Sequence, residues 1–486
     1  MRRTSESRVA CTALVALLAG CSLAPAYQVP PIPLPAQYRE PAPWTEAQPS
    51  DQLPRGSWWT LYDNAELSAL ESVLEANNPD LAAALAHYEQ ARAFDAQVRS
   101  QLFPLVSGML DASRDRQSNT RPLRGSNQPN EYGAYTAGLQ ADYEVDLWGR
   151  VHNEVSAAHA ETEAAAADLA SARLSLEARL ADDYVSLLGL DREIKLFLDT
   201  VAGYDKALSL TRTLHEGGVV SGLDVSRAQT QLDDTKAQLS ELQAQRALLE
   251  HAIAVLVGAP PPGFSLPADV TLIALPQIPA GIPSTLLQRR PDIAAAERRT
   301  AAANASVGVA RAAFYPDISL SALIGVQSTS TGSWLTAPSA YWAVGPNLVQ
   351  YLFDGGLRRA ELDRAKAVLD ESGARYRSVV LEAFRQVEDN LALLANYGTE
   401  YADQTAAVAA AQHTLDLSLE QYRDGAVDYL NVVESQVVAL ATERAQLRLE
   451  TRRLRASVDL IRALGGGWSA ADLEAGPRAA PAPGSG

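Results

Sequence analysis

The sequence has little cysteine and histidine, and this scarcity excludes several classes of protein. Its 486 residues include only 2 Cys and 6 His. Cys11 lies in an N-terminal targeting segment, so the mature chain keeps one cysteine and cannot build a disulfide framework. The histidines are scattered, and no second pair or nearby cysteine completes a metal site. Because nucleophile motifs and phosphate loops are also missing, we expect no enzyme activity and no cofactor.

Long apolar runs and basic stretches are missing as well. No stretch of about eighteen apolar residues follows residue 20, so the sequence predicts no transmembrane helix. The formal charge is −17, and removal of residues 1–20, with three Arg and one Glu, brings it to −19. A chain this acidic repels nucleic acid, which we exclude as a partner.

The first twenty residues are typical of a signal peptide. Three arginines precede a short apolar segment that ends in Leu-Ala-Gly followed by Cys21. This pattern resembles the bacterial lipoprotein signal, in which the cysteine is lipidated and becomes the first residue. Ser22 follows, rather than aspartate, which resembles the pattern that sorts lipoproteins to the outer membrane. An ordinary signal peptide with a chance cysteine is the alternative.

The chain contains an internal repeat. Two proline-free runs of equal length, 130–259 and 347–476, each hold two helical segments joined by a glycine-containing tip. Short motifs recur about 210 residues apart in both halves. They are Pro79-Asp80 and Pro291-Asp292, Asp146 with Arg150 and Asp354 with Arg358, and Gly218 with Leu223 and Gly425 with Leu430. Such regular spacing indicates a duplication, with both halves intertwined in one body.

The apolar spacing predicts long helices in each half. The segments are 151–214 and 358–421, and about half as long 223–257, 284–314, 429–464 and 63–101, the last interrupted near Pro79. At about 1.5 Å per residue, 151–214 would span roughly 95 Å. In 429–464 a coiled-coil seam is expected, with Arg444 and Thr451 as polar breaks. Its residues are Leu430, Val433, Val437, Leu440, Leu447, Leu454, Val458 and Ile461.

Period-two alternation predicts four β-strands in two hairpins. Ala137, Leu139, Ala141 and Tyr143 share one face of a strand, and the second half repeats the pattern from Ile318 to Val326. Weaker strands at 104–112 and 340–353 complete the hairpins. An apolar face opposite a polar face fits a strand between lipid and water, and a soluble half-buried sheet is the alternative. Four strands cannot close a barrel, because about eight is the smallest, so other chains must contribute strands.

Further motifs, spread from residue 21 to residue 468, are specific in combination. They are the segment 21–30, Trp58-Trp59 with Asp63, Arg289-Arg290-Pro291-Asp292, Phe353-Asp354-Gly355-Gly356, Tyr422-Arg423-Asp424-Gly425 and the segment 464–468. In this order they resemble the TolC family of outer-membrane efflux proteins, in the lipoprotein branch typified by OprM and NodT.

The resemblance implies a mainly α membrane protein that forms a homotrimer. Long antiparallel helical hairpins would form a trimeric α-barrel tunnel in the periplasm, and four strands per chain would contribute to a twelve-stranded transmembrane β-barrel in outer-membrane lipid. Such proteins are passive exit ducts that a periplasmic adaptor docks onto an inner-membrane, proton-driven transporter of the RND type. We expect drugs or other small molecules as cargo; ATP-driven export of proteins or peptides is the alternative.

The resemblance also implies two groups of residues at the closed end of the tunnel. The first is a gate, in which an apolar ring is followed by polar positions: Leu430, Asn431 and Glu434. A merely solvated helix face is the alternative for Glu434. The second is a latch that holds the hairpin tips together: Asp224 and Tyr422, with Arg227 or Arg423 as the cationic partner.

These expectations divide the chain into six segments. Residues 1–20 are the signal peptide, 21–62 an extended arm with the lipid anchor, 260–283 the linker between the halves and 469–486 a disordered tail. The first repeat, 63–259, holds a helix, the β-hairpin 104–147, a long helix, the tip 215–224 and a return helix. The second, 284–468, repeats this order with the β-hairpin 316–353 and the tip 422–429.

We predict that residues 1–20 are removed and that Cys21 carries lipid. Mass spectrometry of the mature N-terminus should find an acylated cysteine as the first residue. A different or unmodified first residue would contradict the predicted lipid anchor, but it would leave the predicted channel unaffected.

Overall fold

A computed structural model describes residues 22–33, 38–39, 56–118, 120, 129–278 and 286–470. The predicted signal peptide, the lipidation site Cys21 and most of the predicted tail lie outside the described residues. The chain forms two compact units, each assembled from segments that are distant in the sequence. Of the helices described, none is both long and apolar enough to cross a membrane.

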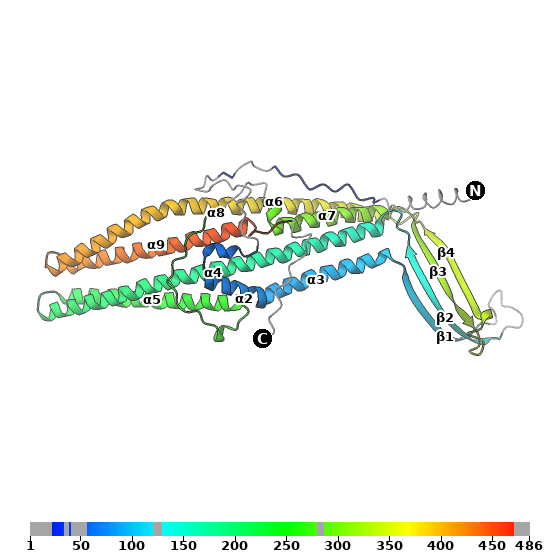
Figure 1. Ribbon diagram of the computed structural model, residues 1–486, viewed down its shortest axis with the longest axis horizontal. Helices are drawn as coiled ribbons and strands as arrows, with labels where there is room; N and C mark the ends of the chain where they lie inside the picture. Colours follow the sequence, from blue (N-terminus) through cyan, green and yellow to red (C-terminus); the bar gives the residue numbers. More distant parts are fainter. Residues whose placement is uncertain are drawn as a thin grey trace. The chain divides into compact units, whose positions relative to one another are not determined.

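The first unit contains a four-stranded antiparallel sheet whose strands follow the chain order (Figure 1). The strands are β1 (Leu105–Arg116), β2 (Glu131–Glu144), β3 (Asp317–Ser328) and β4 (Ala340–Val349). The register pairs Leu139 with Ile324 and Ile324 with Trp342, so three strands contribute to one apolar row. These three side chains are 56, 63 and 74% exposed. The apolar faces predicted for β2 and β3 therefore lie on the same side of the sheet, as expected from the alternation of apolar and polar residues in both strands.

The start of the arm is bound to the helices of this first unit. The Ser22 hydroxyl donates to Asn153 Oδ1 on α4 (Arg150–Glu216) at 2.7 Å. The Tyr27 hydroxyl donates to a carboxylate oxygen of Glu297 on α7 (Pro291–Ala312) at 2.5 Å. Between them, Asn304 Nδ2 donates to the backbone carbonyl of Pro25 at 2.8 Å. The chain that follows Cys21 is thus fixed by side chains from both repeats.

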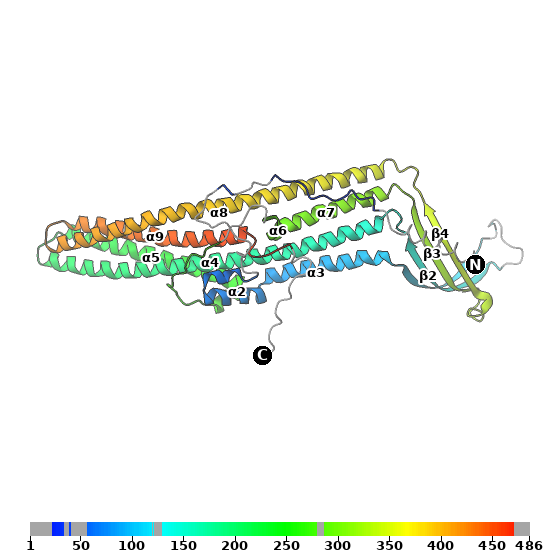
Figure 2. The ribbon, with the colours of Figure 1, turned by 45° about the horizontal axis from the view of Figure 1, so that its top comes forward.

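The second unit is a helical bundle around a mainly aliphatic core. Its helices include α2 (Ala65–Asn77), α5 (Gly222–Leu256) and α9 (Tyr429–Ala463), with parts of α3 (Pro79–Arg99), α4 and α8 (Leu357–Arg423). The short 3-10 helix η1 (Trp58–Tyr62) buries both tryptophans and Tyr62 among α2, α4, α5 and α9. Figures 1 and 2 show α5 alongside α4, and α9 alongside α8.

Helix lengths repeat between the two halves of the chain. The long helices α4 and α8 each have 67 residues, and the return helices α5 and α9 each have 35. The predicted fold class, with two long helical hairpins and four strands, is confirmed.

The junction at the end of each return helix is built in the same way in both halves. Asn78 Nδ2 donates to the Leu256 carbonyl of α5 at 2.7 Å. Arg290 Nη1 donates to the Ala463 carbonyl of α9 at 2.9 Å. Each donor directly precedes the Pro-Asp pair that begins α3 or α7. This recurrence of atomic contacts is what a duplicated sequence predicts.

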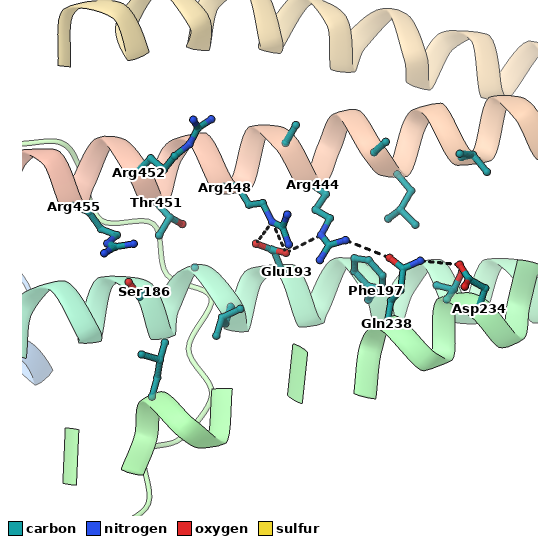
Figure 3. A pocket seen from close by; sticks show the side chains of 18 of the residues that line it. Ser186, Glu193, Phe197, Asp234, Gln238, Arg444, Arg448, Thr451, Arg452 and Arg455 are labelled. Atoms are coloured by element: carbon teal, nitrogen blue, oxygen red, sulfur yellow. Dashed lines mark hydrogen bonds and ion pairs between the residues drawn. The ribbon is translucent and has the colours of Figure 1, made fainter. Parts of the chain in front are cut away.

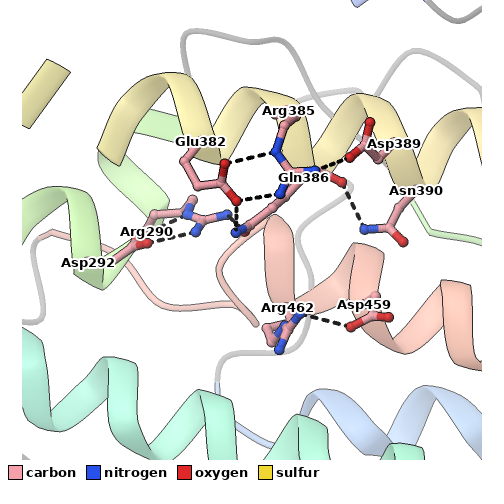
Figure 4. A network of polar contacts seen from close by, with 9 residues as sticks. All are labelled: Arg290, Asp292, Glu382, Arg385, Gln386, Asp389, Asn390, Asp459 and Arg462. Atoms are coloured by element: carbon pink, nitrogen blue, oxygen red, sulfur yellow. Dashed lines mark hydrogen bonds and ion pairs between the residues drawn. The ribbon is translucent and has the colours of Figure 1, made fainter. Parts of the chain in front are cut away.

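The second junction is the more polar of the two. The Arg290 guanidinium also bonds the Asp292 carboxylate at 2.7 and 3.0 Å and Gln386 Oε1 at 3.0 Å (Figure 4). Arg290 is buried, so these bonds and the carbonyl of Ala463 replace the water that its charge loses. The residue thus connects α7, α8 and the end of α9.

The prediction of one continuous helix over 284–314 is wrong, because the helix is interrupted at Arg290. The described part of that segment is a short helix, α6 (Leu286–Arg289), followed by α7. The break falls at Arg290 because a proline at 291 disfavours helical geometry at the residue before it.

The predicted seam in α9 has the wrong phase in its first half. The buried residues there are one position earlier than expected: Tyr429, Val432, Gln436 and Ala439. Leu430 and Val437 are instead 42 and 47% exposed. Only from Leu454 onward do the predicted residues lie in the core. The spacing of apolar residues gives a helical period, but here two adjacent faces of the helix satisfy it.

We predict that Gly465→Ala lowers the thermal unfolding midpoint. Gly465 ends α9 with a φ of 94°, and an added Cβ would lie 2.0 Å from the carbonyl oxygen of Arg289. Strain of this kind costs about 1–3 kcal/mol before the clash is counted.

Gly203→Ala is the matched control, because nothing lies within 4 Å of its added Cβ inside α4. Alanine should leave the midpoint unchanged or raise it there. Equal midpoints for the Gly465 and Gly203 variants would contradict the junction geometry.

Candidate functional site

Each helical hairpin ends in a tip built around one glycine in the left-handed conformation. Gly218 follows α4 with a φ of 72°, and Gly425 follows α8 with a φ of 73°. The next amide bonds the carbonyl five residues earlier, at 2.9 Å for Val219 and 2.8 Å for Ala426. Both long helices therefore reverse through a Schellman motif, which requires a residue that tolerates positive φ.

A buried cluster, here called the tip cluster, joins the two hairpins. The rings of Tyr422 and Tyr429 lie with centroids 5.2 Å apart and an interplanar angle of 58°. The other buried members come from α4, α5 and α9: Tyr204, Leu208, Ala228, Leu232 and Val432. Burial of these side chains, rather than an ion pair, holds the tips together within one chain.

The predicted latch residue Tyr422 belongs to this cluster. Burial raises the pKa of its phenol, the Thr211 side chain lowers it and the negative charge of Asp224 raises it. The hydroxyl is buried, yet it makes no hydrogen bond of normal geometry with any residue described by the structure. Tyr422 and Asp224 are thus brought near each other across the hairpins without a bond between them.

Asp224 is engaged by its own helix. The Ser221 backbone N–H donates to Asp224 Oδ2 at 3.2 Å and the Asp224 backbone N–H donates to Ser221 Oγ at 3.4 Å, which forms a capping box at the start of α5. The Ser221 hydroxyl also donates to Asp224 Oδ2 at 2.8 Å. Arg227 Nη1 lies 3.6 Å from the other carboxylate oxygen. Arg423 is exposed and forms no ion pair with a described residue. Of the two predicted cationic partners, Arg227 is therefore the one beside Asp224, but on the same hairpin.

The predicted gate residues Leu430, Asn431 and Glu434 all lie exposed at the start of α9. Leu430 and Glu434 are four residues apart and so share one face of the helix. Glu434 forms no ion pair with any described residue, so its charge is uncompensated within the chain. The face they share is not the one that Tyr429 and Val432 bury in the tip cluster.

Further along the helices from the tips, a groove of about 720 Å³ lies between α4, α5 and α9 (Figure 3). Glu193 of α4 is buried in it and binds two arginines, with Arg444 Nε and Arg448 Nε each at 3.1 Å. Arg444 Nη1 also donates to Gln238 Oε1 at 3.3 Å. One carboxylate thus binds two consecutive turns of α9 to α4.

The contact between α4 and α9 is also close. An added Cβ at Gly189 would lie 2.3 Å from Thr451 Oγ1, so a larger residue there would force Thr451 to move. Arg444 and Thr451, predicted as breaks in an apolar seam, are therefore its contact residues. In an acidic chain, the recurrence of arginine at 444, 448, 452 and 455 is the sequence feature that could have indicated this contact.

Among the residues that the structure describes, no group of His, Cys, Asp and Glu is placed to bind a metal ion.

Comparison with known proteins identifies the family. A model described as outer membrane efflux protein matches residues 70–259 and 282–466. The chain belongs to the outer membrane efflux protein family. The family predicted from the motifs is thereby confirmed, and with it a role in efflux at the outer membrane. It is a family of efflux channels rather than of enzymes.

Relatives in this family align over nearly their whole length. The antibiotic efflux pump outer membrane protein ArpC of Pseudomonas putida is 32% identical over 455 residues, 93% of this chain and 94% of that one. The pyoverdine export outer membrane protein OpmQ of Pseudomonas aeruginosa is 33% identical over 464 residues, 93% and 97%. The outer-membrane channel OprN matches with a TM-score of 0.84 and 31% identity, over 92% of this chain and 100% of that one.

We predict that Tyr422→Phe leaves the tips as stable as in the wild type. The lost hydroxyl is buried without a good hydrogen bond, so its removal costs little. Tyr422→Ala should instead cost about 3–5 kcal/mol, because it empties part of the tip cluster. Hydrogen exchange of peptides covering the tips distinguishes these variants. If Phe and Ala accelerate exchange equally, the hydroxyl itself is the latch and the packing account is wrong.

Proposed function

We propose that three copies of this chain form the outer-membrane exit duct of a tripartite efflux system. The supporting observation is the sheet: one of its faces is apolar and exposed, and neither of its edge strands has a partner strand among the described residues. Lipid cannot satisfy free backbone groups, so a sheet placed in it must be closed by strands from other copies. Four strands from each of three chains would give the twelve strands that the family resemblance implies.

In this proposal the chain works without a cofactor and without a catalytic step. A lipid on Cys21 anchors the mature N-terminus in the outer membrane, and the helical hairpins extend into the periplasm. A periplasmic adaptor joins the duct to a proton-driven transporter of the RND type in the inner membrane. That transporter supplies the energy, and the duct only conducts.

The proposed cargo is drugs or other small molecules. Two relatives support this choice by their names, one for antibiotic efflux and one for pyoverdine export. Deletion of the gene, followed by susceptibility tests across drug classes and an inventory of secreted proteins, tests the choice. Raised susceptibility with unchanged secretion is expected. Changed secretion with unchanged susceptibility would favour protein or peptide export instead.

The second hairpin tip is the proposed gate. Three copies of Leu430 would converge on the axis as an apolar constriction, with Glu434 about one turn away and Asn431 beside it. Like charges so close repel, and the tip cluster with Asp224, Tyr422 and either Arg227 or Arg423 would hold the tips shut against that repulsion.

We expect the Leu430→Ala trimer to conduct ions several-fold better than the wild type in planar bilayers. The matched control is Leu223→Ala, since Leu223 takes the equivalent position at the first tip and is 58% exposed. That control should conduct like the wild type. Wild-type conductance of the Leu430 variant would place the constriction elsewhere.

Glu434→Gln should reduce the preference for cations, because it removes a ring of uncompensated carboxylates. Glu216→Gln removes one exposed carboxylate from the other tip and should leave selectivity unchanged. Reversal potentials in a salt gradient measure both. Equal selectivity of the Glu434 variant and the wild type would leave Glu434 as an ordinary solvated residue.

A further inference from the structure

Glu71 of α2 is a fully buried carboxylic acid. Its exposed fraction is 0%, and neither carboxyl oxygen has a hydrogen-bond partner among the described residues. It shares the buried face of α2 with Leu67, Leu70 and Leu74. An ionised carboxylate there would lose its hydration without compensation, which costs far more than burying the neutral acid.

A second buried carboxylic acid, Glu177 of α4, lies close by and is 3% exposed. The indole Nε1 of Trp58 donates a hydrogen bond to it at 3.0 Å. Two further described charged groups act on the pKa values of the pair, Glu75 of α2 and Arg173 of α4, and the Arg173 Nε lies 3.9 Å from a Glu75 oxygen. Arg173 thus pairs with Glu75, the least buried of the three carboxyl groups, and no described lysine or arginine forms an ion pair with Glu71 or Glu177.

The surroundings favour the neutral form of both buried acids. Burial raises the pKa of Glu71, and the charges of Glu177 and Glu75 raise it further. Burial also raises the pKa of Glu177; the Trp58 hydrogen bond and Arg173 lower it, whereas Glu75 raises it. Each acid therefore holds its proton to a higher pH when the other is ionised.

We propose that Glu71 and Glu177 form a proton-binding site that keeps η1 and α2 docked on α4. Trp58 connects η1 to α4, because its ring lies in the core of the second unit and its indole N–H donates a hydrogen bond to Glu177. Loss of the proton from Glu71 places a charge under the helix that the surrounding apolar side chains cannot solvate. The docked state of residues 58–77 therefore depends on pH.

The direction in which stability changes with pH follows from proton linkage. The native state holds a proton that the unfolded chain releases above the ordinary pKa of glutamate. Stability is therefore greatest at low pH and falls as the pH rises toward the raised native pKa. Between the ordinary pKa of glutamate and the raised native pKa, one such proton lowers the ratio of folded to unfolded protein about tenfold for each unit by which the pH rises.

Infrared spectroscopy of the full-length protein in detergent detects the proton directly. At pH 7 the wild type should show the C=O stretching band of a protonated carboxylic acid, and Glu71→Gln should weaken it. The matched control, Glu66→Gln, removes an exposed carboxylate from the same helix and should leave the band unchanged. Absence of the band from the wild type, or a band of equal strength in the Glu71 variant, would overturn the proposal.

Thermal unfolding from pH 6 to pH 10 tests the consequence. The midpoint of the wild type and of Glu66→Gln should fall with rising pH more steeply than that of Glu71→Gln. Glu71→Leu serves as a second variant, because an apolar side chain of similar size suits the site and does not titrate. Equal pH dependence of the wild type and of the Glu71 variants that fold would contradict the proposed coupling.

Discussion

The two free edges of the four-stranded sheet are the constraint on which the account depends. β1 and β4 each leave one side of their backbone without a partner strand in the part of the chain that the structure describes. The exposed row formed by Leu139, Ile324 and Trp342 suits lipid, where every unpaired backbone group costs several kcal/mol. Such a sheet is stable in lipid only when other copies cover its edges.

The duplicated architecture makes the differences between its halves informative. Equivalent positions near the two tips carry Asp224 and Asn431, and Arg227 and Glu434. At the first tip the two charges lie 3.6 Å apart and satisfy each other within α5. At the second tip Glu434 forms no ion pair with a residue that the structure describes. The same fold thus yields two tips that differ in the charge of their equivalent positions.

The sequence predicted the family, the long helices and the strands, because each depends on local periodicity or on motifs. It failed where a residue's environment comes from another element. The first turns of α9 bury Tyr429 and Val432 rather than Leu430, since α4 and α5 determine which of two apolar faces is covered. Glu71 lies at an apolar position of its own helix, a visible signal, but Glu177 and Trp58 could be placed beside it only by the fold.

The number of chains in the detergent-solubilised assembly tests the central claim most directly. Native mass spectrometry, checked by sedimentation, should give three copies of the mature chain, because one chain supplies four strands and the family resemblance implies a barrel of twelve. The same preparation should conduct ions in planar bilayers. A single chain that conducts would show that the edges need no other copy, and the account of the duct would then be wrong.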